Sequence, residues 1–275
     1  MFLSTFFTTS GMDEHPGAYF FGTQHLIYFL LNIVLFIILW KLLKKMSKKN
    51  QDKLITVFLI LILLLKYAGD VLFIYEYYNV SPALSSYPHP FLDVDTIISF
   101  QLCGITNILL PLTIWFKIKP LKEFVFLSSI LGGIAVVIYP VTILYGNPFT
   151  VTLPMVRSTF VHFFLIFIPL FLINRGDIKL NSKNWRQIAI GFGALLLWAT
   201  FGNYVIDIGD NNLYLLENPF LQTDIPILNM IPNGWHILVL LLIFGGGYFF
   251  TYKIAKIFEP NEFMNRLKRM KKKKA

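Results

Sequence analysis

FFGTQHLIYFLLNIVLFIILW, residues 20–40, contains no Asp, Glu, Lys or Arg and is followed at once by the basic segment KLLKKMSKK, residues 41–49. A helix needs about 20 mostly apolar residues to cross a bilayer, because its backbone must satisfy its own hydrogen bonds there. Lysines directly after such a run are typical of the cytoplasmic side of a membrane. The two segments therefore predict a transmembrane helix that starts outside the cell and ends in the cytoplasm.

Six further apolar runs follow along the chain, and each is too long to be a strand of a membrane barrel. Apolar residues make up 56% of the chain and charged residues only 14%, which is unlike a soluble domain. The sequence predicts an all-α polytopic membrane protein, a seven-transmembrane helix bundle in one domain over residues 1–257. The predicted spans lie near residues 20–40, 54–74, 95–116, 121–141, 154–173, 187–205 and 235–255.

The positions of the basic residues predict the orientation of this bundle. All lysines and arginines except Lys66 and Arg157 lie in four segments, residues 41–53, 117–122, 175–186 and 253–274. All four reach the cytoplasm if the N-terminus is outside and the C-terminus is inside, so residues 258–275 are predicted to be a basic cytoplasmic tail. The net charge of +9 thus reflects topology in the cell membrane, and no nucleic-acid-binding signature accompanies it.

Polar residues within the spans concentrate at one depth. An ionisable side chain there costs about 2.5–3.5 kcal/mol on insertion scales, so each one needs a partner or a function. In the predicted orientation the outer halves of the spans hold His25, Lys66, Asp70, Gln101, Cys103, Asn107, Arg157, His162, Asn203 and Tyr204. This convergence predicts an outward-facing polar pocket inside the membrane.

Three of these residues suit nucleophilic chemistry. Cys103 and Asn107 are four residues apart and share a helix face, and His162 is predicted at a similar depth on another span. A histidine that takes the thiol proton gives a thiolate able to attack an ester, and an amide such as that of Asn107 or Gln101 can stabilise the oxyanion. A single membrane cysteine also occurs as a small packing residue, and the residues alone leave that alternative open.

The charged residues have two interpretations as well. Arg157 and Lys66 suit a phosphate or a carboxylate, which a guanidinium binds bidentately. Lys66 and Asp70 are four residues apart, so an ion pair that neutralises both is the alternative, and the spacing favours it. The other polar residues assigned to substrate binding are His25, Gln101, Asn203 and Tyr204. The single cysteine and the spacing of the histidines match no metal motif, so neither a metal nor a cofactor is predicted.

Several short motifs carry a family resemblance. They are FFGTQH at residues 20–25, Gln101-Leu102-Cys103 with Asn107, GGIA at residues 132–135, and NNLYL at residues 211–215 before the last span. In these motifs and their order the chain resembles the YwaF-like bacterial integral membrane proteins, which are related to the eukaryotic TMEM-type membrane acyltransferases. The resemblance implies a seven-helix fold with Cys103 as the acyl-accepting nucleophile and His162 as its base. The family usually has a histidine two residues before the cysteine, where this chain has Gln101.

The expected function is therefore cysteine-dependent acyl transfer on phospholipids. The alternative is a non-catalytic transporter or lipid-binding membrane protein, in which the same polar groups only hydrate a path for a solute. Membrane lipids and a phospholipid or acyl-lipid substrate are the predicted partners, and the sequence indicates no particular protein partner.

Overall fold

The computed structural model describes Phe6, residues 21–79, 97–140, Leu144, residues 151–206, 211–219, Leu221 and residues 228–260. The side chains of Asp70, Phe73 and Glu76 lie outside this description, as do the predicted tail beyond residue 260 and much of the long loops. Over the described residues the chain is helical and has no strand, which confirms the predicted all-α class.

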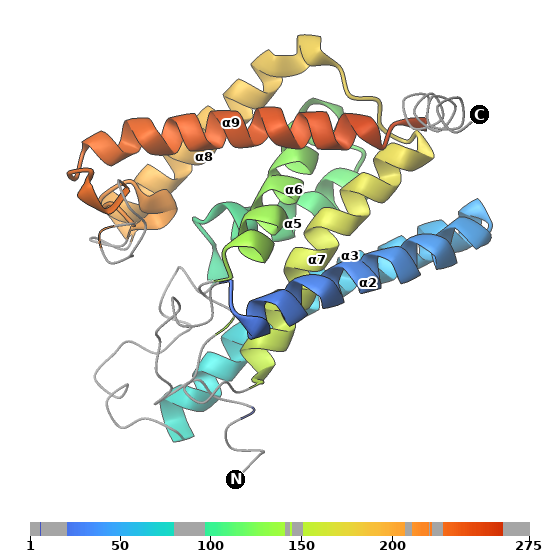
Figure 1. Ribbon diagram of the computed structural model, residues 1–275, viewed down its shortest axis with the longest axis horizontal. Coiled ribbons are helices and arrows are strands. Elements are labelled where there is room, and N and C mark those ends of the chain that lie inside the picture. Colours follow the sequence, from blue (N-terminus) through green and yellow to red (C-terminus); the bar gives the residue numbers. More distant parts are fainter. Residues whose placement is uncertain are drawn as a thin grey trace.

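Five helical segments are long and apolar enough to cross a membrane, which agrees with a multi-pass membrane protein. They are α2 (Thr23–Lys45), α6 (Lys122–Ile138, with a preceding 3-10 turn), α7 (Leu153–Arg175), α8 (Trp185–Phe201, with short flanking turns) and α9 (Trp235–Ile257). Figure 1 shows α5, α6 and α7 between α9 on one side and the pair of α2 and α3 on the other.

Two further helices occupy the regions of the second and third predicted spans. The second, α3 (Lys48–Asn79), has 32 residues and extends beyond the predicted range at both ends. The third, α5 (Leu102–Trp115), has 14 residues and begins later than the predicted start near residue 95. At about 1.5 Å per residue α5 is roughly 21 Å long, less than the roughly 30 Å of a bilayer core.

The core of the bundle is built by α6 and α7. About two thirds of the most apolar part of each is buried, whereas in α2 and α9 the buried share is 17%. The rings of Phe163, Phe167 and Phe171 stack along α7 at centroid distances of 5.6 and 5.9 Å, and Phe58 of α3 stacks on Phe164 at 4.6 Å. The exposed apolar side chains of α2 and α9 are thus left to face lipid.

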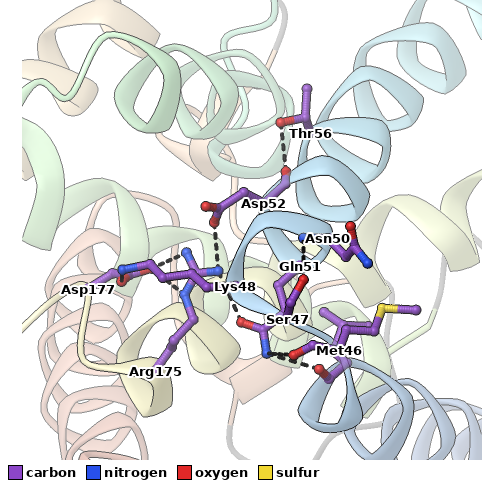
Figure 2. Close-up of polar contacts among 10 residues, drawn as sticks. Met46, Ser47, Lys48, Asn50, Gln51, Asp52, Thr56, Arg175 and Asp177 are labelled. Atoms are coloured by element: carbon purple, nitrogen blue, oxygen red, sulfur yellow. Dashed lines mark hydrogen bonds and ion pairs between the residues drawn. The ribbon is translucent and has the colours of Figure 1, made fainter.

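At the end of α7, the side chain of Arg175 joins two of the basic segments. Its guanidinium forms ion pairs with Asp52, at 2.7 Å, and with Asp177, and donates to Gln51 Oε1 at 3.3 Å (Figure 2). The amide nitrogen of Gln51 donates to the carbonyl oxygen of Leu43 at 2.9 Å. These contacts fix the turn between α2 and α3 against the end of α7.

The other basic segments meet at the same place. Lys122, at the start of α6, donates to the carbonyl oxygen of Asp177 at 3.2 Å. Glu259, just beyond α9, accepts a hydrogen bond from the backbone N–H of Leu180 at 2.7 Å. The connections after α2, α5 and α7 and the end of α9 therefore share one end of the bundle, called the inner end below. The opposite end, where Cys103 lies, is called the outer end.

Candidate functional site

A non-helical segment, residues 98–101, precedes α5 and is held by α8. The indole N–H of Trp198 donates to the carbonyl oxygen of Ser99 at 3.2 Å, and the ring of Phe100 stacks on Trp198 at 5.0 Å. Gly202 gives this ring its space, since a Cβ there would lie 2.6 Å from Phe100. These contacts explain why the third helix begins at Leu102 and not near residue 95.

As a result Cys103 is the second residue of α5. The first amide N–H groups of a helix have no acceptor within the helix, and those of Cys103 and Gly104 lie near the thiol. The side chain of Ser99 packs directly on Gly104, where no other residue would leave room for it. A helix N-terminus stabilises negative charge, so these groups offset part of the cost that burial imposes on a thiolate.

His162 on α7 has one ring nitrogen paired and the other unpaired. Its Nδ1 lies 2.7 Å from the carbonyl oxygen of Ser158, which can only accept, so Nδ1 carries the proton. The other nitrogen, Nε2, is buried and has no hydrogen-bond partner among the described residues. The side chain of Arg157 lies within electrostatic range of the ring. In a neutral His162 the lone pair therefore lies on Nε2.

Two consecutive glycines of α6 lie between these groups. A Cβ on Gly132 would lie 3.9 Å from Cys103 Cα, and one on Gly133 would lie 2.8 Å from the carbonyl oxygen of His162. Gly133 thus lets α7 approach α6 closely at the histidine, whereas Gly132 makes an ordinary contact with α5 at the cysteine. Asn107, one turn beyond Cys103, is buried, and its Oδ1 also has no partner among the described residues.

A loop from the outer end covers the start of α5. The side chain of Asn203, in the π-helical turn Gly202–Ile206, accepts from the N–H of Asn212 at 2.8 Å and donates to its carbonyl at 3.2 Å. Gln101 Oε1 accepts from the N–H of Leu213 at 3.1 Å. Asn203 and Gln101, both predicted to bind substrate, thus use these groups to hold residues 212–213.

The next residue of this loop, Tyr214, adds a group that the sequence did not point to. Its phenol lies within electrostatic range of the Cys103 thiol and of Tyr139. Its carbonyl oxygen accepts from His236 Nε2 at 3.0 Å, and His236 Nδ1 accepts from the N–H of Gly234. The motif NNLYL was a resemblance signal in the sequence, and its role is to bring Tyr214 to the cysteine.

His25 and Tyr204 lie apart from this group. Both ring nitrogens of His25 are paired, Nδ1 with the N–H of Phe21 at 3.1 Å and Nε2 with the carbonyl oxygen of Val137 at 3.1 Å. His25 therefore fastens the start of α2 to the end of α6. The side chain of Tyr204 is 62% exposed.

Lys66 and Arg157 converge on one part of α3. The guanidinium of Arg157 lies directly over Gly69, where any side chain would collide with it. Lys66, three residues earlier, donates to the carbonyl oxygen of Ile97 at 3.4 Å and lies 4.3 Å from the ring centroid of Tyr67. The two predicted cations are thus near neighbours, whereas the predicted partner Asp70 has a side chain outside the described residues.

An apolar slot of about 340 Å³ opens between α2, α6, α7 and α9. Its lining is almost wholly aliphatic and aromatic and includes Phe36, Val137, Ile166 and Phe250. Asn32 is the polar residue of the lining, and its buried Oδ1 has no partner among the described residues. Ile166 of the lining is one helical turn from His162, and Phe163, the residue after His162, also lines the slot.

Comparison with known proteins gives one family. Neither a curated protein nor a solved structure matches the chain. The family model described as the TMEM164 family matches residues 20–252, a range that includes Cys103, His162 and Tyr214. Since the match covers well over half of the chain, this integral membrane protein belongs to the TMEM164 family.

Proposed function

We propose that the protein transfers an acyl chain between lipids through a thioester on Cys103. The observation that carries the proposal is the arrangement around Gly132 and Gly133. There a thiol at a helix N-terminus and a histidine with an unpaired, buried Nε2 lie on neighbouring faces of α6. Covalent acyl transfer needs a nucleophile and a base within reach of each other, and the packing of both residues against consecutive glycines of α6 supports such an arrangement.

In the first step His162 Nε2 takes the thiol proton and Cys103 Sγ attacks the ester carbonyl of a phospholipid. The C–S bond forms, the ester C–O bond breaks, and the lysophospholipid leaves with the proton from His162. In the second step an acceptor hydroxyl attacks the thioester while His162 takes its proton. The oxygen ester forms, the C–S bond breaks, and His162 returns the proton to the Cys103 thiolate. No external oxidant or metal takes part.

The substrate would extend in two directions from this centre. The apolar slot next to Ile166 is suited to an acyl chain, and its volume lies at the lower end of ligand pockets. Lys66 of α3 and Arg157 of α7, whose guanidinium lies over Gly69 of α3, would supply positive charge for the phosphate of the headgroup. Asn107 would supply an amide near the reacting carbonyl.

We also propose that all seven helices cross the cell membrane, with the N-terminus outside, the C-terminus inside and the tail after residue 257 in the cytoplasm. All four basic segments meet at one end of the bundle, as expected if that end faces the cytoplasm. This supports the topology, because the chain then crosses the membrane twice between one basic segment and the next. The short α5 would cross with the non-helical residues before it. A periplasmic reporter should be active after Asp210 and silent after Lys183, and the reverse pattern would refute the orientation.

A second function, lipid binding or transport without covalent chemistry, is favoured by a different observation. The slot is apolar throughout most of its lining and would hold a chain whether or not Cys103 reacts. This function predicts that the Cys103→Ala variant still binds or transports lipid in cells as well as the wild-type protein does.

Purified protein incubated with a phospholipid carrying a labelled acyl chain distinguishes the two functions. The chain has a single cysteine, so any thioester must form on Cys103. We expect a labelled protein adduct that neutral hydroxylamine releases and that Cys103→Ala lacks. Cys103→Ser is the matched control, because an ester on serine would resist neutral hydroxylamine. The absence of any adduct on folded wild-type protein would refute acyl transfer through Cys103.

A further inference from the structure

The loop that carries Tyr214 is fixed from three helices. The Asn203 side chain holds Asn212 through two hydrogen bonds from the end of α8, and Gln101 holds Leu213 from the start of α5. His236, at the start of α9, holds the carbonyl of Tyr214 itself and is 1% exposed. A loop fixed this firmly positions its side chains as precisely as a helix does.

The backbone of the loop is strained where it carries Tyr214. Leu213 has a φ of 52° and Tyr214 a φ of 57°, which is the left-handed region that residues with a Cβ rarely adopt. Such conformations persist only where the surrounding contacts impose them, and they concentrate at functional sites. Here they turn the chain so that the Tyr214 phenol comes within electrostatic range of the Cys103 thiol.

The Tyr214 phenol can act as a donor there. Burial, followed by the neighbouring Cys103 and Tyr139, raises the pKa of Tyr214 above its usual value of 10.0, so the hydroxyl keeps its proton at neutral pH. The residue is 44% exposed, which leaves the ring accessible from the outer end of the bundle. Its own carbonyl is bound by His236 of α9, in addition to the bond that Gln101 makes to the preceding residue.

We propose that Tyr214 is a further catalytic residue, whose hydroxyl hydrogen-bonds to the oxyanion that forms when Cys103 attacks an ester. The proposal rests on the proposed acyl transfer. As Sγ adds to the carbonyl carbon, the C=O electron pair moves to the oxygen. This oxygen accepts a hydrogen bond from the Tyr214 hydroxyl. When the C–O bond to the leaving lysolipid breaks, the pair returns to form the thioester carbonyl, and Tyr214 keeps its proton throughout.

The test compares Tyr214→Phe with wild type and with Tyr252→Phe on the inner part of α9, using a phospholipid with a labelled acyl chain. The initial rate of hydroxylamine-sensitive labelling of Cys103 is measured at saturating lipid. Loss of one oxyanion donor costs about 10²–10³-fold in rate. We expect a decrease of that size for Tyr214→Phe, without a matching rise in the lipid concentration at half-maximal rate. Alkylation of Cys103 by iodoacetamide, which forms no oxyanion, should stay near the wild-type rate in the variant.

The possible results separate the two proposals. Normal labelling by Tyr214→Phe beside labelled wild type would overturn the role of Tyr214 and leave the thioester standing. A parallel fall in labelling and alkylation would also overturn it, since that result indicates a role in shaping the site around the thiol. No labelling of folded wild-type protein would refute the thioester, and the oxyanion role of Tyr214 with it.

Discussion

At the inner end of the bundle, Arg175 is bonded to Asp52, Asp177 and Gln51, and Glu259 and Lys256 are bonded to each other and to the backbone of Leu180. At the outer end, the Nε2 of His162 and the Oδ1 of Asn107 are buried without a partner among the described residues. Polar groups that only stabilise a fold are normally paired, because leaving one unpaired costs about 1–3 kcal/mol. Glu123 at the inner end also has one buried oxygen, Oε2, without a partner among the described residues, but its Oε1 accepts from Asn181 and Asn184. The charged groups of the inner end are thus bonded to one another and to the backbone, and we expect that end to hold the helices together and the outer end to supply groups for a ligand.

The buried histidines His25 and His162 allow this comparison to be tested directly. The largest effect on acyl transfer is expected from His162→Gln. A glutamine keeps a donor for the Ser158 carbonyl but has no basic nitrogen, so acyl transfer should fall about 10²–10⁴-fold. The measurement is the labelling rate of Cys103 together with the melting temperature in detergent.

The matched variant is His25→Gln, because His25 is similarly buried but has both ring nitrogens paired. It should lower the melting temperature while the protein that remains folded transfers at near the wild-type rate. If His25→Gln and His162→Gln lost transfer equally, the distinction between paired and unpaired histidines would be wrong.

The inner end should respond in the opposite way, through stability alone. Arg175→Met keeps the length of the side chain but leaves the partly exposed Asp52 and Asp177 without their shared cation. We expect a loss of about 1–3 kcal/mol of stability, smaller than for a fully buried pair because solvent screens these groups. Thermal unfolding in detergent measures it, with the exposed Arg186→Met as the control. A loss of transfer at unchanged stability would show that the inner end takes part in the chemistry.

The sequence predicted much of the fold for a simple reason. The length and apolar content of α2, α6, α7 and α9 leave little choice but membrane helices. The start of α5 was not predictable in this way, because residues 97–100 are themselves largely apolar and the break comes from contacts with Trp198 and Gly202. Local pattern alone therefore placed Cys103 within a span and missed its position at a helix N-terminus.

The site was predictable only in part for a related reason. Depth in the membrane selected Cys103 and His162, which both pack against α6, but it selected His25 and Asn203 by the same argument. Only the hydrogen bonds show that His25 and Asn203 are occupied in holding helices and loops together. Tyr214 was not predicted as a site residue, because it lies in a loop, where no periodic pattern indicates which residues face the site.

The last pair of variants tests Gly133, one of the two consecutive glycines of α6. A Cβ at Gly133 would lie 2.5 Å from Ile166 and 2.8 Å from the His162 carbonyl, so Gly133→Ala forces α7 away from α6. Overpacking of this kind costs about 1–3 kcal/mol, and it should also slow transfer by separating His162 from Cys103. At Gly193 of α8 nothing lies within 4 Å, so Gly193→Ala should change stability by no more than about 1 kcal/mol, in the favourable direction of helix propensity. If Gly133→Ala matched Gly193→Ala in melting temperature and in labelling rate, α6 would not set the spacing of Cys103 and His162. The unpaired Nε2 of His162 would then have to serve a group other than the Cys103 thiol.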